Sequence, residues 1–108
     1  MRATSACLYT VHCTLPDEAT AARWVLWLLD EHLDDVKQAG AQDATLVRLD
    51  SETIDYEVRY VFPDRTTYTR YAIEHAPALQ AEGMRLFPAD LGLVYRRSLG
   101  DEILSFAR

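Results

Sequence analysis

The sequence predicts a single α+β domain in which four antiparallel strands and two helices follow the order β-α-β-β-α-β. Three observations support this prediction. Residues 53–62 alternate between apolar and charged side chains, as in a strand with one buried face. Residues 17–38 repeat apolar side chains at helical spacing. A second helical stretch, residues 64–85, contains Pro77, which cannot lie inside a helix without removing a hydrogen bond.

The composition of the 108-residue chain fits one globular domain, residues 1–108. A net charge of −6 argues against a nucleic-acid partner, which usually requires a basic patch. No run of apolar residues is long enough to cross a membrane, and residues 1–6 do not resemble a signal peptide. We therefore expect a cytoplasmic protein with neither nucleic acid nor membrane as a partner. Residues 1–5 are expected to form an extension and residues 100–108 a tail.

The first strand is predicted over residues 7–14 and carries both cysteines of the chain. Cys7 and Cys13 lie six residues apart, which corresponds to about 20 Å along a straight strand. A disulfide requires Cα atoms about 4.4–6.8 Å apart. We therefore expect two reduced thiols in the core.

The first helix is predicted from the cap Asp17 to about Gln38, and Gly40 is expected to end it. At 100° per residue, its apolar stripe contains Ala21, Val25, Leu29, His32 and Val36. Trp24 falls at the edge of this stripe.

Trp27 falls almost opposite the stripe, among charged residues. Because an exposed tryptophan usually has something lying over it, we expect a cover for Trp27. The candidates are a partner subunit or the apolar tail residues Ile103, Leu104 and Phe106.

The second half of the chain begins with a strand over residues 45–50 and a polar hairpin connection to residues 53–62. Asp64 is expected to cap the second helix. The predicted inner face of that helix contains Tyr68, Ala72, His75, Ala76 and Leu79. We expect a break near residues 75–76, a short helical continuation to about residue 85, and a last strand over residues 92–99.

This order of elements, joined by right-handed crossovers, predicts a ferredoxin-like sandwich. Its antiparallel sheet has the strand order 4-1-3-2, and both helices cover one face.

The other face of this sheet is predicted to be polar. If the helices cover Tyr56, Val58 and Tyr60, then their neighbours Asp55, Glu57 and Arg59 point away. Thr10 and His12 lie beside them, and Arg48 and Arg96 are further candidates for this face. An exposed surface of mixed charge is one interpretation. We favour a dimer face made of His12, Asp55, Glu57, Arg59 and Arg96.

His32 is the main candidate for chemistry, because it lies within an apolar stripe where its imidazole requires a partner. A core histidine hydrogen-bonded to a tyrosine or a backbone carbonyl is one interpretation. The other is an acid/base or ligand-binding group in a cavity between helix and sheet. The expected cavity neighbours are Trp24, Arg48, Tyr56 and Tyr60. His75 is a second catalytic candidate.

Several site classes lack their sequence motifs. The histidines and cysteines show no metal-binding spacing, so neither a metal nor another cofactor is expected. No glycine-rich phosphate loop and no G-x-S-x-G nucleophile motif occurs. RNA-recognition domains share the predicted topology but carry aromatic residues in a basic surround on the open face. That face is charged here.

Several motifs together resemble a small bacterial family of domains of unknown function in the dimeric α/β-barrel (ferredoxin-like) group. They are Trp24-x-x-Trp27-x-x-x-Glu31-His32-Leu33, Gly40, Arg48-Leu49, Tyr56-x-Val58-x-Tyr60, Tyr71-x-x-x-His75-Ala76-Pro77-x-Leu79 and Tyr95-Arg96. The chain departs from the family pattern at residues 1–6, 41–43 and 95–97.

The resemblance implies the fold and a homodimer, but no activity. Related dimeric barrels include monooxygenases, haem-degrading enzymes and small isomerases, some with a histidine comparable to His32. We therefore expect a small-molecule-binding or regulatory homodimer. The alternatives are a cofactor-independent enzyme, monooxygenase- or isomerase-like, that uses His32, and a protein-interaction module that uses Trp27 and the tail.

Overall fold

The computed structural model describes residues 5–106 and confirms the predicted order of strands and helices. The elements are β1 (Cys7–Leu15), α1 (Glu18–Trp27), a π-helical turn (Leu28–His32), α2 (Leu33–Gln38), β2 (Asp43–Arg48), β3 (Ile54–Phe62), α3 (Arg65–Glu74), α4 (Ala76–Leu86), a 3₁₀ turn (Ala89–Leu91) and β4 (Val94–Asp101). Residues 1–4 of the expected extension and 107–108 of the expected tail lie outside the described residues. Gly100 and Asp101 continue β4, so the tail begins later than expected.

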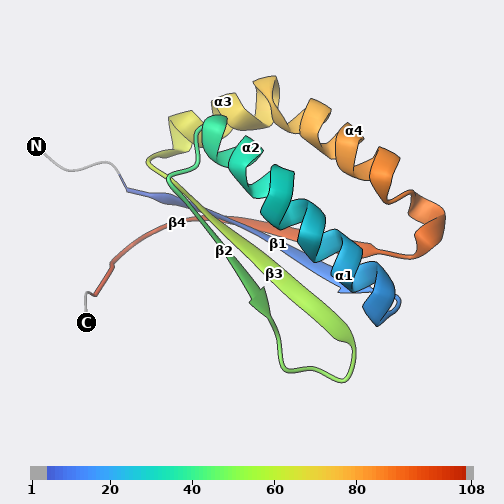
Figure 1. Ribbon diagram of the computed structural model, residues 1–108. Helices are drawn as coiled ribbons and strands as arrows, with labels where there is room; N and C mark the ends of the chain where they lie inside the picture. Colours follow the sequence, from blue (N-terminus) through green and yellow to red (C-terminus); the bar gives the residue numbers. More distant parts are fainter. Residues whose placement is uncertain (1–4, 107–108) are drawn as a thin grey trace, which may run out of the picture.

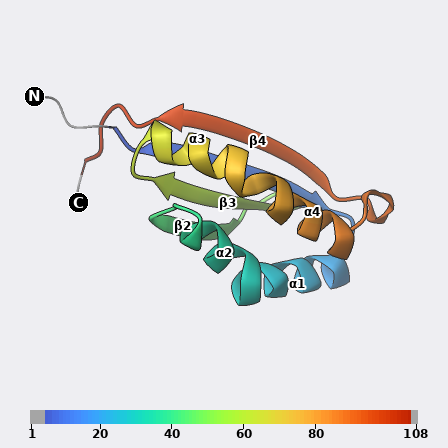
Figure 2. The same cartoon turned by 90° about the horizontal axis from the view of Figure 1, so that it is seen from above.

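The four strands form one antiparallel sheet in the order β2-β3-β1-β4, which is the predicted order read from the other edge. Figure 1 shows that all four helices lie over one face of this sheet, and Figure 2 shows β4 along the edge away from β2. The fold is that of the ferredoxin-like sandwich.

The core lies between the sheet and the helices, and alternate residues of the two central strands build its floor. Tyr9 is paired with Tyr60, and Val11 with Val58, so the apolar sets of β1 and β3 share one face. Cys7 and Cys13 belong to this face and are buried free thiols, as predicted.

The first helix differs from the prediction because it is not a regular α-helix. The N–H of Leu33 bonds to the carbonyl of Leu28, five residues back, and so closes a π turn. A π turn holds more residues than an α turn, which keeps Trp24, Leu28, His32 and Val36 on the inner face. Leu29, expected in the stripe, is 61% exposed, whereas Trp24 is 1% exposed. The predicted stripe is therefore wrong at Leu29, and Trp24 lies within the inner face rather than at its edge.

The second helix breaks where Pro77 predicts it: α3 ends at Glu74, and α4 begins at Ala76 with the proline in its first turn. His75 lies at this junction with a non-helical backbone, so the helical period does not continue through it. The imidazole is consequently exposed, not on the inner face as expected. Tyr71 takes the buried inner position instead. Within residues 5–106, every helix is too short or too polar to span a bilayer.

Candidate functional site

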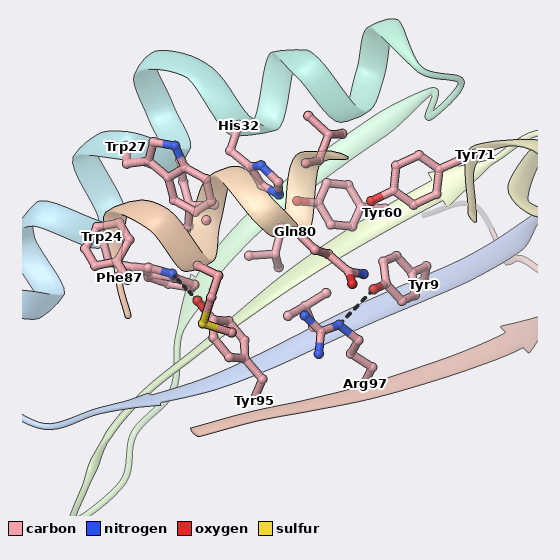
Figure 3. A pocket seen from close by; sticks show the side chains of 16 residues that line it. Tyr9, Trp24, Trp27, His32, Tyr60, Tyr71, Gln80, Phe87, Tyr95 and Arg97 are labelled. Atoms are coloured by element: carbon pink, nitrogen blue, oxygen red, sulfur yellow. Dashed lines mark hydrogen bonds between the residues drawn. The ribbon is translucent and has the colours of Figure 1, made fainter. Parts of the chain in front are cut away.

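A cavity of about 210 Å³ lies between the helices and the sheet (Figure 3). Its walls are mostly apolar and aromatic, with a few polar side chains among them, which is typical of small-molecule sites. The lining residues are Tyr9, Val11, Trp24, Trp27, Leu28, His32, Val58, Tyr60, Tyr71, Leu79, Gln80, Gly83, Met84, Phe87, Tyr95 and Arg97.

The π turn places two rings side by side on the helical wall. The ring centroids of Trp27 and His32 lie 4.4 Å apart, with 27° between the ring planes. Phe87 packs against the other side of the indole at 5.6 Å. Gly83 of α4 leaves room for the indole, because a Cβ atom there would lie 3.1 Å from it. Trp27 is thus packed within its own chain.

This packing corrects the expectation that the tail or a partner subunit covers Trp27. The cover is Gly83 and Phe87, which the helical periodicity of the first helix could not indicate. The tail residues Ile103, Leu104 and Phe106 are themselves strongly exposed. The interaction-module alternative consequently loses the exposed tryptophan on which it depended.

Tyrosines form the floor and the end wall of the cavity. Tyr9 stacks on Tyr60 with centroids 5.8 Å apart and lies 6.3 Å from Tyr71. Tyr60 and Tyr71 are only 2% and 3% exposed. Burial raises the pKa of both phenols, so both stay protonated at neutral pH. Within residues 5–106, neither hydroxyl has a protein hydrogen-bond partner, and neither is sealed off without one. Both therefore border the cavity.

The edge strand β4 contributes two further polar groups. The indole Nε1 of Trp24 donates to Tyr95 Oη at 3.0 Å, and Arg97 Nε donates to Tyr9 Oη at 3.1 Å. The guanidinium carbon of Arg97 lies 5.2 Å from the centre of the Tyr95 ring. Gln80, Met84 and Arg97 keep access to solvent, so the cavity opens between α4 and β4.

His32 lies in the cavity wall, half-buried, and burial lowers its pKa against the weaker opposing effect of Asp35. The imidazole is therefore neutral at neutral pH. Neither a tyrosine nor a backbone carbonyl among the described residues hydrogen-bonds to it, so the interpretation as a satisfied core histidine is wrong. His32 is one of the residues that line the cavity.

The structure brings together only part of the predicted pocket. Trp24, His32 and Tyr60 line the cavity, but Arg48 and Tyr56 do not. Arg48 lies on the helical face of β2, where it pairs with Glu18 at 2.6 Å and reaches Tyr56 Oη at 3.2 Å. The ion pair of Arg48 and Glu18 is exposed, and neither residue lines the cavity.

The exposed position of His75 puts this second catalytic candidate outside the cavity as well. Five polar lining residues were missed by the sequence prediction: Tyr9, Tyr71, Gln80, Tyr95 and Arg97. A signal for Arg97 exists in the last strand, where it alternates with the apolar Tyr95 and Leu99.

The open sheet face holds the predicted polar set. Asp55 Oδ1 lies 2.8 Å from Nε2 of His12, and Glu57 pairs with Arg59 at 2.8 Å. Arg96 lies opposite His12 across the β1–β4 pair, on the same face. Three hydroxyl groups, from Thr14, Thr53 and Ser51, also donate to Asp55. These four bonds, led by that of Thr14, hold the pKa of Asp55 well below its usual range.

Within residues 5–106, no group of three or more histidine, cysteine, aspartate or glutamate side chains is placed to hold a metal ion.

The model of a domain of unknown function, DUF4286, matches residues 6–99. The chain belongs to the DUF4286 family. A search of curated proteins finds no significant match.

Solved structures similar to this DUF4286 member share its fold at low sequence identity. A dimeric ferredoxin-like protein from an uncultured marine organism has a TM-score of 0.76 and 10% identity, over 96% of this chain and 100% of that chain. A putative antibiotic biosynthesis monooxygenase from Bacillus cereus has a TM-score of 0.71 and 11% identity, over 96% and 99%. A variant of SnoaB, a cofactor-independent oxygenase from Streptomyces nogalater, has a TM-score of 0.68 and 13% identity, over 97% and 100%. These likenesses establish the ferredoxin-like fold.

Proposed function

We propose that this DUF4286 protein is a cytoplasmic homodimer that binds a small planar molecule in the cavity between its helices and its sheet. One observation carries the proposal: several polar side chains border an otherwise aromatic cavity without a protein partner. His32, Tyr60 and Tyr71 are the clearest cases. These groups are open to the cavity, so a ligand bound there can supply the hydrogen bonds that the described part of the protein does not.

The binding proposal is tested by a thermal-shift screen against metabolites. The variants are His32→Ala and, as a matched control, His75→Ala, which changes an exposed histidine outside the cavity. A cavity ligand should stabilise the wild type and His75→Ala, and should stabilise His32→Ala much less. A ligand that stabilises all three proteins equally binds elsewhere and would contradict the proposal.

The open sheet face supports the homodimer. It carries both signs of charge on adjacent strands, so two copies can meet with complementary charges. Two similar structures are described as dimeric ferredoxin-like proteins. The buried free thiols are compatible with the reducing cytoplasm.

Light scattering measures the oligomeric state directly. A dimer of 12.3 kDa chains has twice that mass. Arg96→Glu, on the open face, should weaken the dimer, whereas Arg85→Glu on α4 should leave it intact. A wild-type mass of one chain at micromolar concentration would refute the homodimer.

A second candidate function, catalysis, is favoured by the neutral imidazole of His32 in the cavity wall. A neutral histidine can accept a proton from a bound substrate. The test uses a ligand found by the screen. Wild-type protein should convert it chemically, and His32→Gln should bind it but convert it far more slowly. An equal rate for both proteins would exclude His32 as the base.

A further inference from the structure

Arg97 is the one charged side chain among the described residues that line the cavity. It lies on β4 opposite Val11, on the helical face of the sheet. No carboxylate within residues 5–106 pairs with it, although the chain as a whole carries a net charge of −6. A guanidinium without a carboxylate partner is available to bind the two oxygens of an anionic group.

The contacts of Arg97 leave its outer edge available to a ligand. Its Nε donates to Tyr9 Oη at 3.1 Å, and its plane is held near the Tyr95 ring, with the guanidinium carbon 5.2 Å from the ring centre. The two Nη groups form no hydrogen bond or ion pair within the described residues. Figure 3 shows the guanidinium reaching into the cavity, with the Gln80 amide directed to the same region. A paired set of donors in this geometry suits the two oxygens of a carboxylate.

The walls restrict the shape of the ligand. Trp27, Tyr60 and Tyr95 present ring faces or edges from three different elements, so the space between them suits a flat molecule. The hydroxyl groups of Tyr60 and Tyr71, which lie beside Tyr9, offer further hydrogen bonds. Both tyrosines are more than nine-tenths buried.

We propose that the cavity selects planar organic anions, namely aromatic carboxylates whose charged group binds Arg97 at the opening and whose flat body lies between the aromatic walls. This inference rests on the proposed ligand-binding function and adds the chemical class of the ligand. It assigns Arg97 as the specificity-determining residue, with Tyr9 and Tyr95 holding its guanidinium in position.

The test compares two probes of the same shape, naphthoate, which is an anion, and naphthamide, which is neutral. Quenching of the fluorescence of Trp24 and Trp27 reports binding, because both indoles line the cavity. The wild type should bind naphthoate at least about tenfold more tightly than naphthamide, since a hydrogen bond to a charged group is stronger than a neutral one. Arg97→Gln should bring the ratio close to one without weakening naphthamide.

Two further variants separate the local effect from other causes. Arg70→Gln makes the same change of net charge at an exposed position of α3, outside both the cavity and the proposed dimer face, and should keep the wild-type preference. Arg97→Lys keeps the positive charge and should keep part of the preference, even if packing against Tyr95 is weakened. The thermal unfolding midpoint of each variant confirms that it is folded.

The possible outcomes distinguish this inference from the function beneath it. Equal affinities for the two probes in the wild type would overturn the selection of anions while leaving the cavity as a binding site. A preference that persists in Arg97→Gln, or is lost equally in Arg70→Gln, would overturn the role of Arg97. If neither probe binds at millimolar concentration, both the binding site and the inference built on it fall.

Discussion

Loss of one tyrosine hydroxyl should lower the unfolding free energy at one position in the cavity wall and leave it nearly unchanged at another. Tyr95 Oη accepts the indole N–H of Trp24 at 3.0 Å, and Trp24 is almost completely buried. Tyr95→Phe therefore leaves a buried donor without a partner, which costs about 1–3 kcal/mol of unfolding free energy. Tyr60→Phe breaks no protein hydrogen bond within residues 5–106. Its unfolding free energy should stay within about 0.5 kcal/mol of the wild type.

Urea unfolding followed by far-ultraviolet circular dichroism measures both effects without relying on the fluorescence of Trp24. With slopes of about 1–3 kcal/mol/M, Tyr95→Phe should lower the midpoint by roughly 1 M, at an unchanged slope. All proteins must be compared at one chain concentration, because the proposed dimerisation would add to apparent stability. If Tyr60→Phe is destabilised as much as Tyr95→Phe, the Tyr60 hydroxyl is already bonded within the fold. The cavity would then offer one donor fewer to a ligand.

Three further predictions concern stability and reactivity. Asp55 has a lowered pKa in the folded chain, so its stabilising contribution is complete above its ordinary value of 3.8 and is lost as the pH falls below it. The stability difference between wild type and Asp55→Asn should therefore shrink between neutral and acidic pH in denaturant titrations, and a constant difference would contradict this. Burial raises the pKa of Cys7, and it raises the pKa of Cys13 to about 12. Neither thiol should therefore react with a maleimide at neutral pH until the protein unfolds. Rapid labelling of the native protein would argue against their burial. Gly40→Ala should lower the unfolding free energy by roughly 1–3 kcal/mol, because φ of Gly40 is +133° and a Cβ atom would lie 2.8 Å from a threonine methyl group. Gly100→Ala is the control, because a Cβ atom there meets open space. Equal unfolding midpoints of the two variants in calorimetry would refute the difference.

Local signals predicted most of the fold. The alternation in β3 marks its buried face, and Asp17 and Asp64 each cap a helix by accepting a backbone N–H at 2.7 Å. Pro77 marks the helix break to within one residue. These features depend on near neighbours in the chain, which is why the sequence alone reveals them.

The site was predicted less completely because it depends on distant contacts and on one irregular turn. A constant 100° per residue places Leu29 inside and Trp27 outside. The π turn breaks this constant angle, so the residues before it and after it do not follow one helical period. Arg48 was expected near His32, yet it lies beyond the end of the cavity because β2 pairs only with β3. The local pattern of β4 puts Arg97 on the same face as Tyr95 and Leu99, but only the pairing of β4 with β1 brings that face into the site.

The π turn at Leu28–His32 also affects how this chain can be aligned with other proteins. A relative whose first helix is α-helical throughout covers the same distance with one residue fewer. A correct alignment with such a relative therefore needs a single-residue gap inside the helix. Alignment methods that penalise gaps in helices will instead shift Trp24 and Trp27 against their true counterparts. Residues that occupy the same place in the cavities of this protein and its relative would then appear in different alignment columns. The alignment would hide an aromatic wall that the two proteins share.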